Sequence, residues 1–115
     1  MKRLRLSSPL PKPQQQGDVL IQYVASMPTG GKILTSGPRG YVVAEGEATG
    51  HAHVLAAEGV LEMREVDGVI YARIGAPSSL SHEEHHAQIL PSGIVRFGRV
   101  QEYDHFAEEA RQVAD

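Results

Sequence analysis

The sequence predicts an all-β domain, a small antiparallel β-barrel or barrel-like sandwich with one C-terminal helix. About eight short runs rich in β-branched and aromatic residues follow one another along the chain. Turn-forming residues separate these runs, with 12 Gly and 7 Pro among 115 residues. A chain of this length builds one hydrophobic core, so we expect a single domain.

Residues 1–16 are expected to form a disordered leader, because they are rich in Pro and Gln and have no periodic apolar face. The first twelve residues carry four basic and no acidic side chains, whereas the remaining chain carries 7 basic and 14 acidic ones. A short basic run of this kind has little specificity for phosphate. We therefore predict no binding to nucleic acid.

A single β domain is expected over residues 17–115. Strands are predicted at 19–25, 32–35, 41–44, 51–57, 60–66, 69–74, 82–90 and 94–101. The links Glu58-Gly59 and Asp67-Gly68 predict that the three middle strands form a meander, because two-residue links of the Asp-Gly type are typical of hairpins. Residues 75–79 are expected to form a loop.

The end of the chain predicts the only helix, at 104–113. Asp104 is suited to the N-cap, and Phe106, Ala110 and Val113 fall on one helical face. We expect this helix to pack over an open end of the sheet. The sheet edges that remain predict self-association, most simply as a dimer.

Composition excludes several kinds of chemistry. Without Cys there is no disulfide, thiolate metal site or Cys nucleophile. No apolar run is long enough to span a bilayer, and the first residues lack the apolar stretch of a secretory signal, so we expect a cytoplasmic protein without membrane contact. The six His residues are the feature that needs an explanation.

Five of these His residues occupy two short segments. His51 and His53 are two apart, so on a strand both imidazoles would point to one side, where one cation could bridge them. In the second segment, His82 and His85 meet if the chain is irregular there, whereas His82, Glu84 and His86 share a face in a strand. We favour the irregular arrangement.

The sequence thus predicts one divalent transition metal ion, with zinc or iron favoured, bound by His51, His53, His82 and His85. His86 and Glu84 are the nearest substitute ligands. Glu83 and Glu84 are the candidate catalytic residues, as proton carriers beside the metal. The expected function is that of a metal-dependent enzyme or a binder of a small polar ligand. The alternative is a non-enzymatic interaction module whose metal, if any, is structural.

These segments also carry a resemblance. Gly-Glu-Ala-Thr-Gly-His-Ala-His at 46–53 and His-Glu-Glu-His at 82–85 resemble motifs of small bacterial proteins of unassigned function. The chain is also weakly similar to the cupin superfamily, which implies a small β-barrel with a His-bound metal. His51 and His53 match its first motif, and Pro91 and Gly93 match its second, but Arg96 stands where the third His would be. Glu58 has the spacing of a cupin ligand but is expected in a turn, so we do not assign it to the metal.

Overall fold

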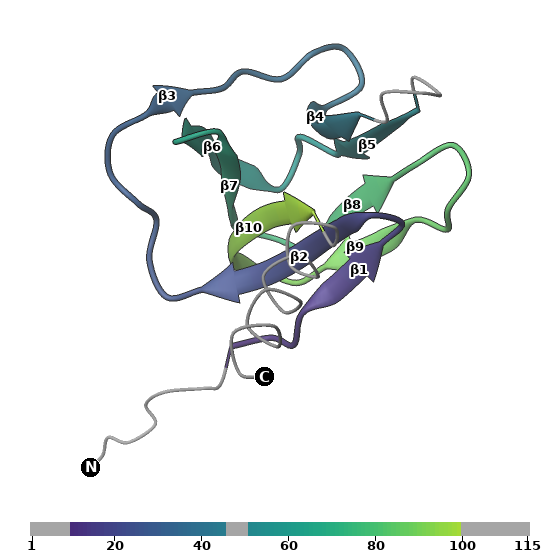
Figure 1. The fold of residues 1–115 in the computed structure, drawn as a ribbon, viewed down its shortest axis with the longest axis horizontal. Coiled ribbons are helices and arrows are strands. Elements are labelled where there is room, and N and C mark those ends of the chain that lie inside the picture. Colours follow the sequence, from purple (N-terminus) through teal and green to yellow (C-terminus); the bar gives the residue numbers. More distant parts are fainter. Residues whose placement is uncertain (1–9, 46–50, 100–115) are drawn as a thin grey trace, which may run out of the picture.

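The computed structural model describes residues 10–45 and 51–99, and in these ranges the chain is all-β, with two antiparallel sheets and no helix (Figure 1). One sheet has six strands in the order β1 (Gln14–Gln16), β2 (Val19–Val24), β10 (Gly93–Arg99), β7 (Val69–Ile74), β6 (Val60–Val66) and β3 (Lys32–Ile33). The other has four strands in the order β4 (Tyr41–Glu45), β5 (Ala52–Leu55), β8 (Ser78–Ser81) and β9 (Gln88–Leu90).

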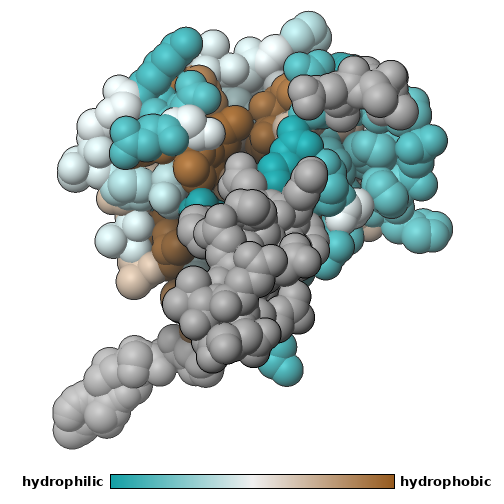
Figure 2. Space-filling model, viewed as in Figure 1, coloured by the Kyte–Doolittle hydropathy of each residue, from teal (hydrophilic) through white to brown (hydrophobic). Residues whose placement is uncertain are grey.

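One hydrophobic core lies between the two sheets. In β2 the burial alternates strictly, with Val19, Ile21 and Tyr23 buried, because successive side chains of a strand point to opposite faces. Buried residues from both sheets join this core, among them Leu55 of β5 and Val95 of β10. Figure 2 shows hydrophobic residues gathered between the sheets and hydrophilic ones around them.

The predicted hairpin at Asp67-Gly68 joins β6 to β7, with Val66 opposite Val69. Asp67 has φ 52° and Gly68 has φ 79°, and two successive positive φ values are what a tight two-residue hairpin turn requires. The predicted hairpin at Glu58-Gly59 is wrong, since β5 pairs with β4 and β8, and β6 pairs with β3 and β7. The chain passes from one sheet to the other here. Gly59 lies so close to the 76–78 segment that an added Cβ would be 2.6 Å from the carbonyl oxygen of Ala76.

Three other expectations differ from the structure. The strands of the described residues form two sheets and no closed barrel. The loop expected at 75–79 is shorter than predicted, because residues 78–81 form strand β8 (Ser78–Ser81). Leu80 of this strand is fully buried, and the buried Ser78 hydroxyl donates a hydrogen bond to the Ala76 carbonyl. Strand structure begins at Gln14, three residues before the expected beginning of the domain. The helix predicted at 104–113 lies outside the described residues.

Within the described ranges, no helix is long and apolar enough to cross a membrane.

Candidate metal centre

Four His side chains from two separate segments meet at one end of the four-stranded sheet. His53 is in β5, His51 directly precedes that strand, and His82 and His85 lie in the loop between β8 and β9. The ring centres of His53 and His82 are 4.3 Å apart, those of His82 and His85 are 4.7 Å apart, and those of His53 and His85 are 6.4 Å apart. His51 is 5.7 Å from His82, with its ring perpendicular to it. The structure thus brings together the four residues that the sequence singled out as metal ligands.

His53 is the buried member of this histidine cluster, with 3% of its surface exposed. Its Nδ1 lies 2.8 Å from Oε1 of Gln16, which is also buried. The amide nitrogen of Gln16 donates to two backbone carbonyls, those of Leu80 and His86, each at 2.9 Å. Because the amide nitrogen is committed to those acceptors, Oε1 must accept, and Nδ1 of His53 must carry the hydrogen. In the neutral ring, this leaves the lone pair on Nε2.

Nε2 of His53 faces the turn between β1 and β2. The Oδ1 atom of Asp18 lies 3.4 Å from it, and the Oδ2 atom of Asp18 accepts a 2.6 Å hydrogen bond from Arg99. Burial lowers the pKa of His53 below its ordinary value of 6.5, and charge on His82 lowers it further, whereas Asp18 opposes the shift. Partial burial alone would raise the pKa of Asp18, but the hydrogen bond and charge of Arg99 outweigh it and lower that pKa. The site therefore pairs a neutral imidazole with a carboxylate.

His82 lies between the other rings. Its Nδ1 accepts a 3.0 Å hydrogen bond from the backbone N–H of Glu84, which places the hydrogen of the neutral ring on Nε2. His85 packs against Gly17, where a Cβ would be only 2.6 Å from Nε2 of His85. Gly17 has a φ of 58°, so glycine meets two needs here, the left-handed backbone and the room for the ring.

The two candidate proton carriers differ in their surroundings. Glu83 accepts a 2.9 Å hydrogen bond from the backbone N–H of Ala52, and this bond, with one from its own N–H, lowers the pKa of Glu83. Glu83 thus fastens the loop to the start of β5. Glu84 is more than half exposed, and its Oε1 lies 3.2 Å from Nδ1 of His51. Of these two glutamates, Glu84 is therefore the one whose carboxylate contacts the histidine cluster.

Three Gln side chains hold the first strand against this loop. Besides the bonds of Gln16, Gln88 donates to the carbonyl of Gln15 at 2.6 Å, and Gln14 donates to Gln88 at 3.2 Å. Strand β1 belongs to the six-stranded sheet, and its partners lie on or beside β8 and β9 of the other sheet, so these bonds join the two sheets (Figure 1). His86 contributes its carbonyl to Gln16, and its side chain is exposed.

Sequence reasoning missed Gln16 and Asp18. Gln16 falls at the end of the expected leader and Asp18 at the start of the expected domain, and neither is a predicted site residue, although both contact His53. A polar side chain just before a strand gives no periodic signal, so nothing local marks Gln16 as buried. For Asp18, the adjacent Gly17 was the one available hint, since a Gly-Asp pair marks a turn that places a carboxylate at a sheet end.

A small cavity adjoins the histidine cluster. It measures about 230 Å³, and His82, Glu83 and Arg39 are among the residues that line it. In the described ranges 10–45 and 51–99, no three His, Asp or Glu side chains have their ligand atoms arranged to hold a metal ion as they stand. The His rings lie beside one another and do not point at a common centre.

Residues 15–100 match the family described as Domain of unknown function (DUF8820), which covers most of the chain, so the chain belongs to this family. Neither the curated proteins nor the solved structures contain a significant match.

Proposed function

We propose that the protein binds one divalent transition metal ion through the histidine cluster, with His53, His82 and His85 as central ligands and His51 as the fourth. Zinc and iron are the favoured ions, because borderline metals suit imidazole nitrogens. The observation that carries the proposal is the hydrogen bond between Gln16 and His53. Metal-bound His almost always donates its other ring N–H to an oxygen acceptor, which directs the free nitrogen at the ion.

The spacing of the rings gives a second argument. Two imidazoles on one tetrahedral ion, with metal–nitrogen distances near 2.0–2.1 Å, have ring centres about 5.3 Å apart. The four ring separations given above for the histidine cluster run from 4.3 to 6.4 Å and so bracket that value. These separations lie within about 1 Å of the value that a shared ion would require, which supports the proposal.

Binding then needs side-chain rotation and the loss of one hydrogen bond at His82. The rings of His53 and His85 are nearly parallel, at 11°, so His85 must turn for one of its nitrogens to converge with Nε2 of His53, whose ring Gln16 holds. In either case His82 loses its bond from the N–H of Glu84, because a metal at Nδ1 takes the lone pair that accepts this bond, and a metal at Nε2 moves the ring hydrogen to Nδ1. His85 and His82 lie in a loop with exposed neighbours, where such rotations meet little packing resistance.

The cavity beside His82 supports a ligand-binding or catalytic role over a purely structural one. Arg39 and Glu83 line this cavity, and their guanidinium and carboxylate groups suit a small polar molecule that reaches the metal. In that role Glu84, whose carboxylate is exposed beside His51, is placed to carry a proton. The bonds from Gln16 favour the second candidate, a structural metal, because an ion here would strengthen a junction between the two sheets.

Metal titration of the full chain, produced without a His tag, tests the proposal. We expect one equivalent of Zn²⁺ to bind in competition with a chromophoric chelator, and His53→Gln, His82→Gln and His85→Gln each to weaken binding by about tenfold or more. The matched control is His86→Gln, because that side chain is exposed in the same loop. Its affinity should equal that of the wild type.

Two results would contradict the proposal. One is uptake of less than about a tenth of an equivalent of any transition metal after dialysis against it. The other is an equal loss of affinity in His86→Gln, which would indicate loose binding by surface imidazoles. Water in the coordination shell of the loaded protein would separate the two roles, because structural zinc is closed by four protein ligands and catalytic zinc retains an open position.

A further inference from the structure

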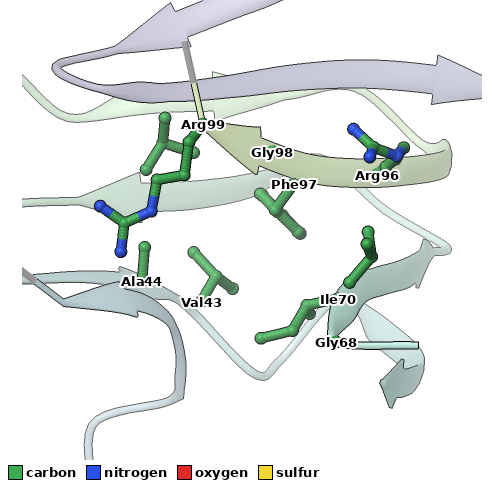
Figure 3. A pocket seen from close by; sticks show the side chains of 10 residues that line it. Val43, Ala44, Gly68, Ile70, Arg96, Phe97, Gly98 and Arg99 are labelled. Carbon is green, nitrogen blue, oxygen red and sulfur yellow. The ribbon is translucent and has the colours of Figure 1, made fainter. Parts of the chain in front are cut away.

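Besides the cavity beside His82, a second cavity of about 180 Å³ lies between the sheets, with the side chains of Val43, Ile70 and Phe97 around one space (Figure 3). Arg96 also borders it, but extends from the face of β10 opposite Phe97, because successive strand residues point to opposite faces. Arg99 is already engaged, because it donates to a carboxylate and to a backbone carbonyl. No described residue therefore offers this space a free charged group, and the cavity beside His82 is the better candidate for a polar ligand.

The cavity beside His82 lies on the side of the four-stranded sheet that faces away from the core. Leu55 of β5 belongs to the core, so Val54 and Ala52 point outwards, because residues alternate between the two faces of a strand. Both are nevertheless buried, at 8% and 6% exposure, and neither belongs to the core cluster. They form the apolar floor of the cavity, and Ser81, opposite Val54 on β8, continues this floor.

Two opposite charges border the floor. Arg39, in the turn before β4, is exposed and has no hydrogen-bond or ion-pair partner among residues 10–45 and 51–99. Glu83 accepts the N–H of Ala52, and because a carboxylate accepts up to about four hydrogen bonds, it keeps acceptor positions for a ligand. Although both groups line one cavity, they form no ion pair with each other. The space between them can therefore take a molecule that carries both charges.

We propose that this cavity binds a free α-amino acid with a small apolar side chain. Its carboxylate would accept hydrogen bonds from the Arg39 guanidinium, which suits the planar carboxylate geometry. Its ammonium group would donate to Glu83, and its side chain would lie on the floor formed by Val54 and Ala52. This inference rests on the proposed function only in naming the small polar molecule of the same cavity, and it requires no metal ion.

The charge of the ligand follows from the lining. A simple anion would meet Arg39 but also the like charge of Glu83, and a simple cation would meet the reverse, whereas a zwitterion satisfies both groups. Size sets the side chain, because a dry cavity of about 150 Å³ accommodates benzene, with about six non-hydrogen atoms. The volume of about 230 Å³ therefore fits about eight or nine such atoms, the size of valine or leucine.

The test is a titration of the metal-free full chain with L-valine, followed by ¹H–¹⁵N NMR. We expect saturable shifts at the amides of Ala52, Val54 and Ser81, which line the cavity. Isovalerate is valine without its amino group, and isobutylamine is valine without its carboxylate. Each analogue should bind at least about tenfold more weakly than valine, because each loses one charged hydrogen-bonding group.

Two variants assign the two charges. Arg39→Met should weaken valine binding by about tenfold or more, to the level of isobutylamine in the wild type. Glu83→Gln should weaken it to the level of isovalerate, and glutamine retains an acceptor for the N–H of Ala52. The matched controls are Lys32→Met and Glu58→Gln, because both residues are exposed and neither lines the cavity. Both controls should bind valine as the wild type does.

Three results would overturn the inference: equal affinity for valine and isovalerate, unchanged valine affinity in Arg39→Met, or no saturable shift with either L-valine or L-leucine. Zinc titration of Arg39→Met keeps the two proposals apart, because Arg39 is not a proposed ligand. Its Zn²⁺ affinity should equal that of the wild type. Absence of amino-acid binding with intact Zn²⁺ binding would overturn this inference alone, and absence of Zn²⁺ binding with intact valine binding would overturn the metal proposal alone.

Discussion

Replacing Gln16 with Leu removes the contact on which the orientation of His53 depends. The side chain is almost fully buried, at 1% exposure, and its amide makes three hydrogen bonds. Leu has a similar volume, so the change removes the polar atoms without leaving a large cavity. The carbonyls of Leu80 and His86 and the Nδ1 hydrogen of His53 all lose their partner.

The expected loss of stability follows from these three groups. A buried polar group left without a partner costs about 1–3 kcal/mol. The Leu80 carbonyl and the His53 ring are in buried residues, whereas His86 is exposed and its carbonyl can bind water. We therefore expect Gln16→Leu to lower the free energy of unfolding by about 3–5 kcal/mol. Since a domain of this size has about 5–12 kcal/mol in total, this is a large share.

Urea unfolding of the metal-free protein, followed by circular dichroism, measures this loss. The matched control is Gln15→Leu on the same strand, because Gln15 is exposed and its side chain bonds only the nearby carbonyl of Gly17. Its free energy of unfolding should stay within about 0.5 kcal/mol of the wild type. A loss below about 1 kcal/mol in Gln16→Leu, with an unchanged dependence on urea, would refute the reasoning.

Four further predictions concern single residues and assembly. Gly17→Ala should destabilise the fold and weaken Zn²⁺ binding, because the added Cβ would meet His85. The control is Gly30→Ala, because Gly30 also has a positive φ but has open space around it. In urea unfolding, this control should show only the backbone strain of about 1 kcal/mol. Burial raises the pKa of Tyr23 from 10.0 to about 12, so the folded form holds the phenol proton more tightly than the unfolded chain does. About 2–3 kcal/mol of the free energy of unfolding should therefore be lost as pH rises from 10 to 12. Tyr23→Phe should remove this loss in unfolding curves taken across that range. The lowered pKa of His53 means that the unfolded chain takes up its proton first, so stability should fall as pH drops below 6.5, and His53→Gln should flatten that dependence. Light scattering should give the mass of a dimer at tens of micromolar, and a mass near 12.5 kDa would contradict this.

Local sequence patterns predicted most strands but not their pairing. Residues 60–66 and 69–74 form strands with the predicted bounds, because each begins and ends with a β-branched residue and the Asp-Gly turn between them sets the register. The link at Glu58-Gly59 looks similar in sequence, yet it joins two sheets. The partners of β5 are β4 and β8, and residues 76–78 lie against Gly59, so this link depends on contacts that its local sequence does not contain.

The candidate site was predictable only in part, for the same reason. The spacing of His51 and His53 and that of His82 and His85 suggested two halves of one site, and the four rings do meet. Gln16 and Asp18 could not be assigned because their roles depend on long-range contacts with His53, across 37 and 35 positions of the chain. A buried glutamine that fixes a ring tautomer has no motif of its own.

X-ray absorption at the zinc edge of the zinc-loaded full chain tests the central claim most directly. If the histidine cluster holds the ion, the spectrum should show nitrogen or oxygen ligands at about 2.0–2.1 Å and the outer-shell scattering of three or four imidazoles. His53→Gln should remove one imidazole from that shell, and His86→Gln should leave it unchanged. A shell with no more than one imidazole, or one that is the same in His53→Gln as in the wild type, would contradict the account.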